Sequence, residues 1–189
     1  MRLGLGLGID VNRRVSGGAA YDYLLSGDGD AEVAYSLRAV NPDYTGAIVL
    51  IRRSSDNAEK AFYKDADNLL SLSSEDGASV SLSTWIGSDN GFVKTWYDQS
   101  GNSKNPTQGT AGNQPRLVEL GNLELSGGKV AVRFVKANNQ RLTILDTTAN
   151  INNMSSYFVG AFAVYSALGG VGYSQLLSIG FDEASVNAK

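Results

Sequence analysis

The first stretch of the chain alternates between apolar side chains and glycine. Leu3, Leu5, Leu7, Ile9 and Val11 occupy the odd positions, which is the period of a β-strand with one apolar face. Glycine weakens a strand interior, so the intervening glycines indicate that another backbone or a large ring approaches closely. We expect residues 1–30 to be an N-terminal attachment segment in which these five side chains anchor the chain to a partner. An edge strand of the chain's own sheet is the alternative.

Beyond residue 30 the pattern predicts two short helices and many short strands. Apolar residues recur at helical spacing in residues 32–40, and residues 80–86 form the second candidate helix. Runs rich in β-branched and aromatic residues, or with alternating polarity, predict strands at residues 46–51, 92–97, 122–125, 129–134, 141–145, 157–165 and 175–179. The Ser126-Gly127-Gly128 sequence predicts a hairpin turn between two of them. Residues 98–115 are polar and rich in turn formers, so we expect them on the surface.

This arrangement favours a mainly β fold in which residues 31–189 form a jelly-roll, concanavalin-like β-sandwich. Few residues follow the last predicted strand, and a jelly-roll needs further strands to cover both apolar faces. We therefore expect the domain to be incomplete at its C-terminal end, and to be completed by a longer chain or by neighbouring copies. Residues 157–165 and 176–179 should then be buried against another chain or be unusually exposed.

The amino-acid composition excludes several kinds of catalytic and metal-binding site. The 189 residues suit one domain, and they include neither cysteine nor histidine. Disulfides, thiolate nucleophiles, Ser-His-Asp triads and the usual zinc sites are therefore excluded. Asp28 and Asp30 begin like a calcium loop, but the later glycine and bidentate glutamate are missing, which favours a solvated turn. We expect no metal, no cofactor and no enzymatic activity.

Charge and hydropathy exclude two classes of partner. The net charge of −3, without a basic run interleaved with aromatic residues, gives no basic surface for nucleic acid. The most apolar stretch, residues 157–168, is about half the length that crosses a bilayer. Charges and glycines near the N-terminus also break the continuous apolar run of a signal peptide. We expect neither a nucleic-acid partner nor a membrane.

Four motifs occur in a fixed order along the chain: Tyr35-Ser36-Leu37-Arg38, Arg52-Arg53-Ser54-Ser55-Asp56-Asn57-Ala58-Glu59, Trp96-Tyr97-Asp98-Gln99-Ser100-Gly101-Asn102 and Asn113-Gln114-Pro115-Arg116. Together they resemble a group of phage-encoded virion proteins and the N-terminal part of the arabinofuranosidase B catalytic domain. The resemblance covers residues 34–180 and implies a concanavalin-like sandwich, with later strands similar to laminin-G-like lectin domains. It does not extend to the catalytic carboxylates of the hydrolase, which have no identifiable counterparts in this sequence, and the hydrolase carries cysteines that this chain lacks.

The candidate ligand-binding residues are Asp98, Asn102, Arg52 and Arg53. Asp98 could bind a sugar or calcium, but a residue that accepts backbone N–H bonds in the turn after Trp96 is the favoured interpretation. The arginine pair could recognise a carboxylate or could simply be a solvated strand end. Both tryptophans of the chain are interpreted as core aromatics rather than sugar-stacking platforms.

These observations favour a structural or attachment component of a phage virion, such as a tail fibre, spike or head fibre, on the particle surface. Its expected partners are other virion proteins bound through the N-terminal segment, further copies of itself, with a trimer favoured, and a host glycan. The alternatives are a glycoside hydrolase of the arabinofuranosidase type, which needs two suitably spaced carboxylates, and a stand-alone carbohydrate-binding module.

Overall fold

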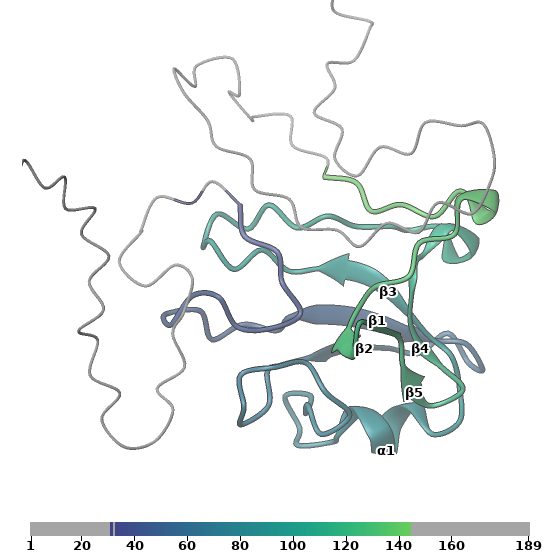
Figure 1. Cartoon of the computed structure of the whole chain (residues 1–189), viewed down its shortest axis with the longest axis horizontal. Helices are drawn as coiled ribbons and strands as arrows, with labels where there is room; N and C mark the ends of the chain where they lie inside the picture. The colour runs from purple at the N-terminus through teal and green to yellow at the C-terminus, as the bar shows by residue number, and fades with distance from the viewer. Residues whose placement is uncertain (1–30, 32, 145–189) are drawn as a thin grey trace, which may run out of the picture. The chain divides into compact units, whose positions relative to one another are not determined.

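The computed structural model describes residues 31 and 33–144 (Figure 1). The predicted attachment residues Leu3, Leu5, Leu7, Ile9 and Val11 lie outside the described residues, and so do the strands predicted at residues 157–165 and 175–179. Those expectations stay predictions.

An antiparallel sheet of five strands, in the order β2-β1-β3-β4-β5, organises the described residues (Figure 1). Its strands are β1 (Val49–Arg53), β2 (Glu59–Phe62), β3 (Gly91–Trp96), β4 (Arg116–Glu119) and β5 (Asn122–Leu123). A separate hairpin pairs β6 (Leu125–Ser126) with β7 (Lys129–Val130). One short α-helix, α1 (Leu82–Ile86), and two single-turn 3-10 helices, η1 (Ala111–Asn113) and η2 (Lys136–Asn138), complete the assigned elements. The protein is therefore mainly β.

The core lies on one face of the sheet. β1 and β3 contribute the fully buried Val49, Ile51 and Val93, because alternate residues of a strand point to the same face. The helix α1 presents Leu82, Trp85 and Ile86 to the same core. Phe62 of β2 meets Trp85 with ring centroids 5.4 Å apart in a tilted arrangement. The prediction that Trp85 is a core aromatic is therefore confirmed.

Local signals explain where α1 begins and ends. The Ser81 hydroxyl accepts a hydrogen bond from the backbone N–H of Thr84, which caps the first turn. Gly87 has a positive φ of 57° and its N–H bonds to the Ser83 carbonyl, which closes the last turn. The second predicted helix, residues 80–86, is thus confirmed over most of its length.

Two tight turns connect neighbouring strands. Leu120 and Gly121 join β4 to β5 with φ angles of 47° and 80°, and Gly127 and Gly128 join β6 to β7 with φ angles of 56° and 75°. Two consecutive positive φ angles match the right-handed twist of flanking strands. The predicted hairpin turn at residues 126–128 is confirmed, but its strands are shorter than expected. Asn122 and Leu123 pair with β4 instead of extending that hairpin.

The helix predicted at residues 32–40 is wrong. Residues 33–41, which we call the entry segment, are not helical, and Arg38 forms an isolated antiparallel bridge with Leu69. Ala39 donates its backbone N–H to the carbonyl of Asn68 (2.8 Å), and Leu70 donates to the carbonyl of Leu37 (2.7 Å). Tertiary partners therefore take the backbone groups that an isolated helix would have bonded internally.

The polar passage of residues 98–115 is not a surface loop throughout. Asp98, Gln99, Gln108 and Gln114 are buried. Residues 106–108 lie beside β3, where Gln108 donates its backbone N–H to Lys94 and Trp96 donates to Pro106. The expectation of a surface location is wrong for these residues, because their side-chain amides and carboxylate replace the partners that water would supply. The strand predicted at residues 141–145 is reduced, within the described residues, to one bridge between Thr143 and Thr107.

Candidate functional site

The loop that follows β3 is built around the carboxylate of Asp98, which is only 2% exposed. Its Oδ1 accepts hydrogen bonds from the backbone N–H groups of Ala34 (2.7 Å) and Ser100 (2.9 Å). Its Oδ2 accepts from the Ser100 hydroxyl (2.8 Å) and from the backbone N–H of Lys104 (3.1 Å). The prediction that Asp98 accepts N–H bonds from the following turn is confirmed. A carboxylate has about four acceptor positions, and this chain occupies them.

Gln99 follows Asp98 in the same loop. The sequence pattern did not identify it as a candidate site residue. Its side chain is fully buried, with Nε2 donating to the carbonyls of Ser36 (3.0 Å) and Arg38 (3.0 Å). Its Oε1 accepts the backbone N–H of Val40 (2.9 Å). A single side-chain amide thus bonds to three alternate backbone positions of this segment, residues 36, 38 and 40.

Further bonds fix the entry segment to this loop. The Trp96 indole N–H donates to the Ser36 carbonyl (3.2 Å), and the Gln99 backbone N–H donates to the Ala34 carbonyl (2.8 Å). The Asn41 amide donates to the Gln99 carbonyl (2.9 Å). We call Trp96, Asp98 and Gln99 the clamp. Trp96 is half-buried and its ring lies 6.5 Å from that of Tyr35, so it supports the entry segment as well as the sheet.

Asn102 lies further along the loop that follows β3 and is exposed. Its side-chain amide donates to the carbonyl of Ala31 (3.1 Å). Asn102 and Asp98 are therefore brought to the same loop, and both contact the residues through which the chain passes from residue 30 into the sheet.

Half-buried tyrosines lie near the clamp. Burial raises the pKa of Tyr44, and the neighbouring Tyr97, Asp98 and Tyr63 raise it further. Burial likewise raises the pKa of Tyr97, with a contribution from Tyr63. The Tyr44 hydroxyl donates to the carbonyl of Ala47 (2.8 Å). Tyr44 and Tyr97 therefore stay neutral phenols at physiological pH.

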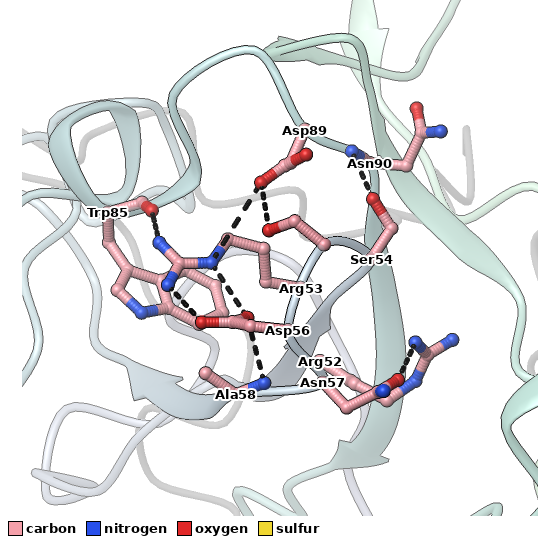
Figure 2. Close-up of polar contacts among 10 residues, drawn as sticks. Arg52, Arg53, Ser54, Asp56, Asn57, Ala58, Trp85, Asp89 and Asn90 are labelled. Atoms are coloured by element: carbon pink, nitrogen blue, oxygen red, sulfur yellow. Dashed lines mark hydrogen bonds and ion pairs between the residues drawn. The ribbon is translucent and has the colours of Figure 1, made fainter.

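Arg53 forms a second polar cluster at the opposite end of β3 (Figure 2). Its guanidinium donates from Nε and NH2 to both carboxylate oxygens of Asp56 (3.1 and 2.6 Å), and from NH1 to the carbonyl of Trp85. The guanidinium carbon lies 5.0 Å from the centroid of the Trp85 ring, a cation–π distance. The hydrogen bonds from Arg53 hold the pKa of Asp56 at about 2, and the same bonds raise the pKa of Arg53.

Loop residues complete the Arg53 cluster. The Ser55 hydroxyl donates to the Asp89 carboxylate (2.5 Å), which lies 4.0 Å from Nε of Arg53. The Asn90 backbone N–H donates to the Ser54 hydroxyl (3.1 Å; Figure 2), and the Ser54 backbone N–H donates to the Asn90 carbonyl (2.9 Å). These bonds join the turn after β1 to the loop before β3. The cluster therefore stabilises the contact between two loops.

Arg52 points to the other face of the sheet, because successive strand residues alternate. It donates to the side chains of Gln114 (2.7 Å) and Asn57 (2.9 Å) and to the carbonyl of Ala111 (3.3 Å). Its guanidinium carbon lies 4.9 Å from the Phe92 ring centroid, and burial lowers its pKa. The two arginines therefore do not form a joint carboxylate-binding fork.

The four predicted ligand-binding residues form two separate groups. Arg52 and Arg53 pair with Phe92 and Gly91 at the beginning of β3, whereas Asp98 follows its end. Six residues of extended strand separate the two groups by about 20 Å. Both groups bond to the protein's own polar atoms, so the geometry favours structural roles for them.

No protein-family model matches the chain, and no curated protein or solved structure matches it. Within the part of the chain that the structure describes, no three or more His, Cys, Asp or Glu residues are grouped so as to hold a metal ion. No helix in that same part is long and apolar enough to cross a membrane. The geometry of the clamp and of the arginine clusters is thus the basis for a functional proposal.

Proposed function

We propose that this protein is a structural attachment component of a phage virion, such as a tail fibre, spike or head fibre. In this proposal residues 1–30 bind other virion proteins on the particle surface, and the rest of the chain displays a lectin-like, jelly-roll sandwich. The protein acts as a homo-oligomer, with a trimer favoured, and a host glycan is its further partner. The motif series that resembles phage virion proteins is the starting point.

The clamp is the observation that carries the proposal. The motif at residues 96–102 supplies the atoms that hold the entry segment, and that segment directly follows the proposed attachment segment. The Gln99 amide bonds to Ser36, Arg38 and Val40 together. Pulling the entry segment away would therefore break several buried or part-buried hydrogen bonds at once, and each buried group left unpaired costs about 1–3 kcal/mol. Such a connection is suited to a junction that carries mechanical force from the attachment segment to the sandwich domain.

Several carboxylates of the described residues bind the protein's own cations and N–H groups, which supports a non-catalytic role for them. Asp98 accepts hydrogen bonds from the chain itself, and Glu59 is ion-paired with Lys94 at 2.8 Å. Arg116 bonds to Glu124 at 2.5 Å and to Glu119 at 2.6 Å. A glycoside hydrolase instead needs one carboxyl that donates a proton and another, about 5–9.5 Å away, that faces the sugar.

Particle composition tests the proposal. Purified phage particles should contain the protein at a fixed copy number per particle, measured by quantitative mass spectrometry after density-gradient purification. Antibodies against residues 31–144 should label intact particles, as seen by electron microscopy. Recovery of the protein only from the soluble lysate, with none in the particle band, would contradict the proposal.

Assays on the purified chain separate the alternatives. We expect no turnover of aryl glycosides above the buffer rate. Turnover that Asp98→Asn or another carboxylate substitution abolishes would instead identify a hydrolase. Glycan binding without turnover, in a protein that never enters particles, would identify a stand-alone carbohydrate-binding module.

A further inference from the structure

A row of mostly charged residues crosses the face of the sheet that lies opposite the core. Arg52 of β1 pairs in register with Glu59 of β2 on one side and with Phe92 of β3 on the other. Phe92 in turn pairs with Arg116 of β4, and Arg116 pairs with Arg133. Residues directly opposite one another in neighbouring strands project from the same face. The row therefore places three arginines, one aromatic ring and one carboxylate on a single surface.

The Arg52 side chain is fixed by groups that do not neutralise its charge. Its guanidinium donates to the side-chain oxygens of Gln114 (2.7 Å) and Asn57 (2.9 Å; Figure 2) and to the Ala111 carbonyl (3.3 Å). The Phe92 ring, 4.9 Å from the guanidinium carbon, supports one side of the guanidinium plane. A guanidinium has five N–H donors and these bonds use three of them, so two remain for a ligand.

The carboxylate opposite Arg52 in the row is bonded to a different cation. Glu59 accepts hydrogen bonds through both of its oxygens from Lys94 of β3 (2.8 Å each). Arg52 forms no ion pair with a carboxylate in the part of the chain that the structure describes. A part-buried guanidinium without an acidic partner favours an external anion, because charge-assisted hydrogen bonds are roughly twice as strong as neutral ones.

Two arginines at the other end of the row share one carboxylate. Arg116 and Arg133 exchange backbone hydrogen bonds (3.0 and 2.8 Å), so their side chains lie opposite each other, where like charges repel. Glu124 lies 2.5 Å from Nε of Arg116 but 3.9 Å from NH1 of Arg133, and Glu119 pairs with Arg116 at 2.6 Å. The Arg133 side chain is 56% exposed. A second cation that can accept an anion therefore lies three strand spacings from Arg52, about 15 Å away.

We propose that this row binds an acidic carbohydrate, with the carboxylate of one uronic-acid sugar on Arg52 and that of another sugar of the same chain on Arg133. A carboxylate accepts two parallel N–H bonds from one guanidinium, which fixes its orientation. Beside Arg52, the exposed Asn57 amide offers N–H donors and the exposed Ala111 carbonyl offers an acceptor. Sugar hydroxyls both donate and accept, whereas the carboxylate side chains of an acidic peptide only accept. The site rests on the proposed function, of which it specifies the class of glycan.

Isothermal titration calorimetry of the full chain with tetragalacturonate tests the site. The methyl ester of the same oligosaccharide, which carries no charge, is the ligand control. We expect the acid to bind, and its affinity to fall as salt is raised. Arg52→Met should weaken binding about tenfold or more, because it removes the guanidinium that holds a carboxylate. Arg133→Met, at an exposed position, should weaken it about threefold.

Arg38→Met is the matched protein control, because it removes an exposed arginine that lies outside the row. Its affinity should differ from that of the unaltered chain by less than about twofold. Absence of tetragalacturonate binding, or equal affinities of Arg52→Met and Arg38→Met, would overturn the proposal. Circular dichroism verifies the folding of each variant. If Arg52→Met does not fold, equal affinities of Arg133→Met and Arg38→Met would overturn it.

Two further ligands test the class of partner. Methyl-ester binding as tight as that of the acid would contradict recognition of a carboxylate. Tighter, Arg52-dependent binding of a hexaglutamate peptide would overturn the carbohydrate assignment and identify an acidic protein partner instead. Calorimetry uses the chain without particles, so absence of the chain from particles together with Arg52-dependent binding of the acid would contradict the virion function and leave this site standing.

Discussion

The buried side-chain oxygen of Gln99 accepts a hydrogen bond from the backbone N–H of Val40, 59 positions earlier in the sequence, at 2.9 Å. The same amide donates to Ser36 and Arg38. This long-range contact therefore fixes the entry segment, which leads from the proposed attachment segment into the sheet, to the loop that follows β3.

Gln99→Leu should destabilise the protein strongly. Leucine matches glutamine in size but removes the hydrogen bonds that Gln99 makes to the Arg38 carbonyl and the Val40 N–H, and one of the two that the Ser36 carbonyl accepts. We expect the free energy of unfolding to fall by about 3 kcal/mol or more. Urea denaturation followed by tryptophan fluorescence measures this change. Asn138→Leu makes the same type of replacement at an exposed position and should alter stability by less than about 0.5 kcal/mol. Similar values for both variants would contradict the clamp.

Asp98→Asn separates a structural from a ligand-binding role. An amide presents one acceptor oxygen, so the new NH2 group would face the Lys104 N–H or the donors on the other oxygen. We expect a loss of about 1–3 kcal/mol in the free energy of unfolding. Asp67→Asn removes the same charge at an exposed site and serves as the control. If Asp98→Asn kept full stability but lost calcium or glycan binding, Asp98 would instead be a ligand.

The sequence allowed prediction of elements whose signal is local. β3 was predicted from its run of β-branched and aromatic residues, and α1 was predicted as a helix at residues 80–86. The structure shows that Ser81 and Gly87 bound that helix. Asp98 was identified through its motif. Gln99 stands beside it, but a polar residue in a polar passage carries no signal of burial. The entry segment was misread because its apolar spacing fits a helix, while the partners that hold it extended come from residues 68–70 and 99.

The remaining errors have the same cause. β2 (Glu59–Phe62) has two charged residues before its single buried position, so its pattern does not distinguish a strand from a turn. β4 (Arg116–Glu119) contains adjacent buried residues, Leu117 and Val118, which do not alternate. Pairing with β1 and β3 defines both strands, and those contacts are not encoded at short range.

The Asp56 carboxyl should titrate at about pH 2. Because its pKa is lower in the folded protein than the unfolded value near 3.9, its contribution to stability is present above about pH 4 and is lost as the pH falls towards 2. Arg53→Met should raise the pKa of Asp56 towards the unfolded value, as measured by carboxyl NMR titration. Asp76, whose pKa of about 2 depends first on Lys60, is the internal control and should not move. An unchanged Asp56 titration in Arg53→Met would contradict the assignment.

Gly121→Ala and Gly127→Ala compare two turn glycines. Both have positive φ, so alanine should cost about 1–2 kcal/mol at either position. An added Cβ at Gly121 would also stand 2.4 Å from the Gly87 carbonyl oxygen, whereas nothing lies within 4 Å at Gly127. We therefore expect Gly121→Ala to lower the thermal midpoint clearly more than Gly127→Ala. Equal thermal midpoints for the two variants in calorimetry would show that the contact between the turn and Gly87 does not contribute to stability.

Removal of residues 1–14 tests the central claim most directly, namely that the N-terminal segment attaches a folded domain which the clamp secures. Full-length and truncated chains are supplied to phage assembly, and the fraction of each that sediments with particles is measured. We predict that the truncated chain keeps the circular dichroism spectrum and unfolding free energy of the full chain but is absent from particles. Equal incorporation of both chains, or loss of folding in the truncated chain, would contradict this account.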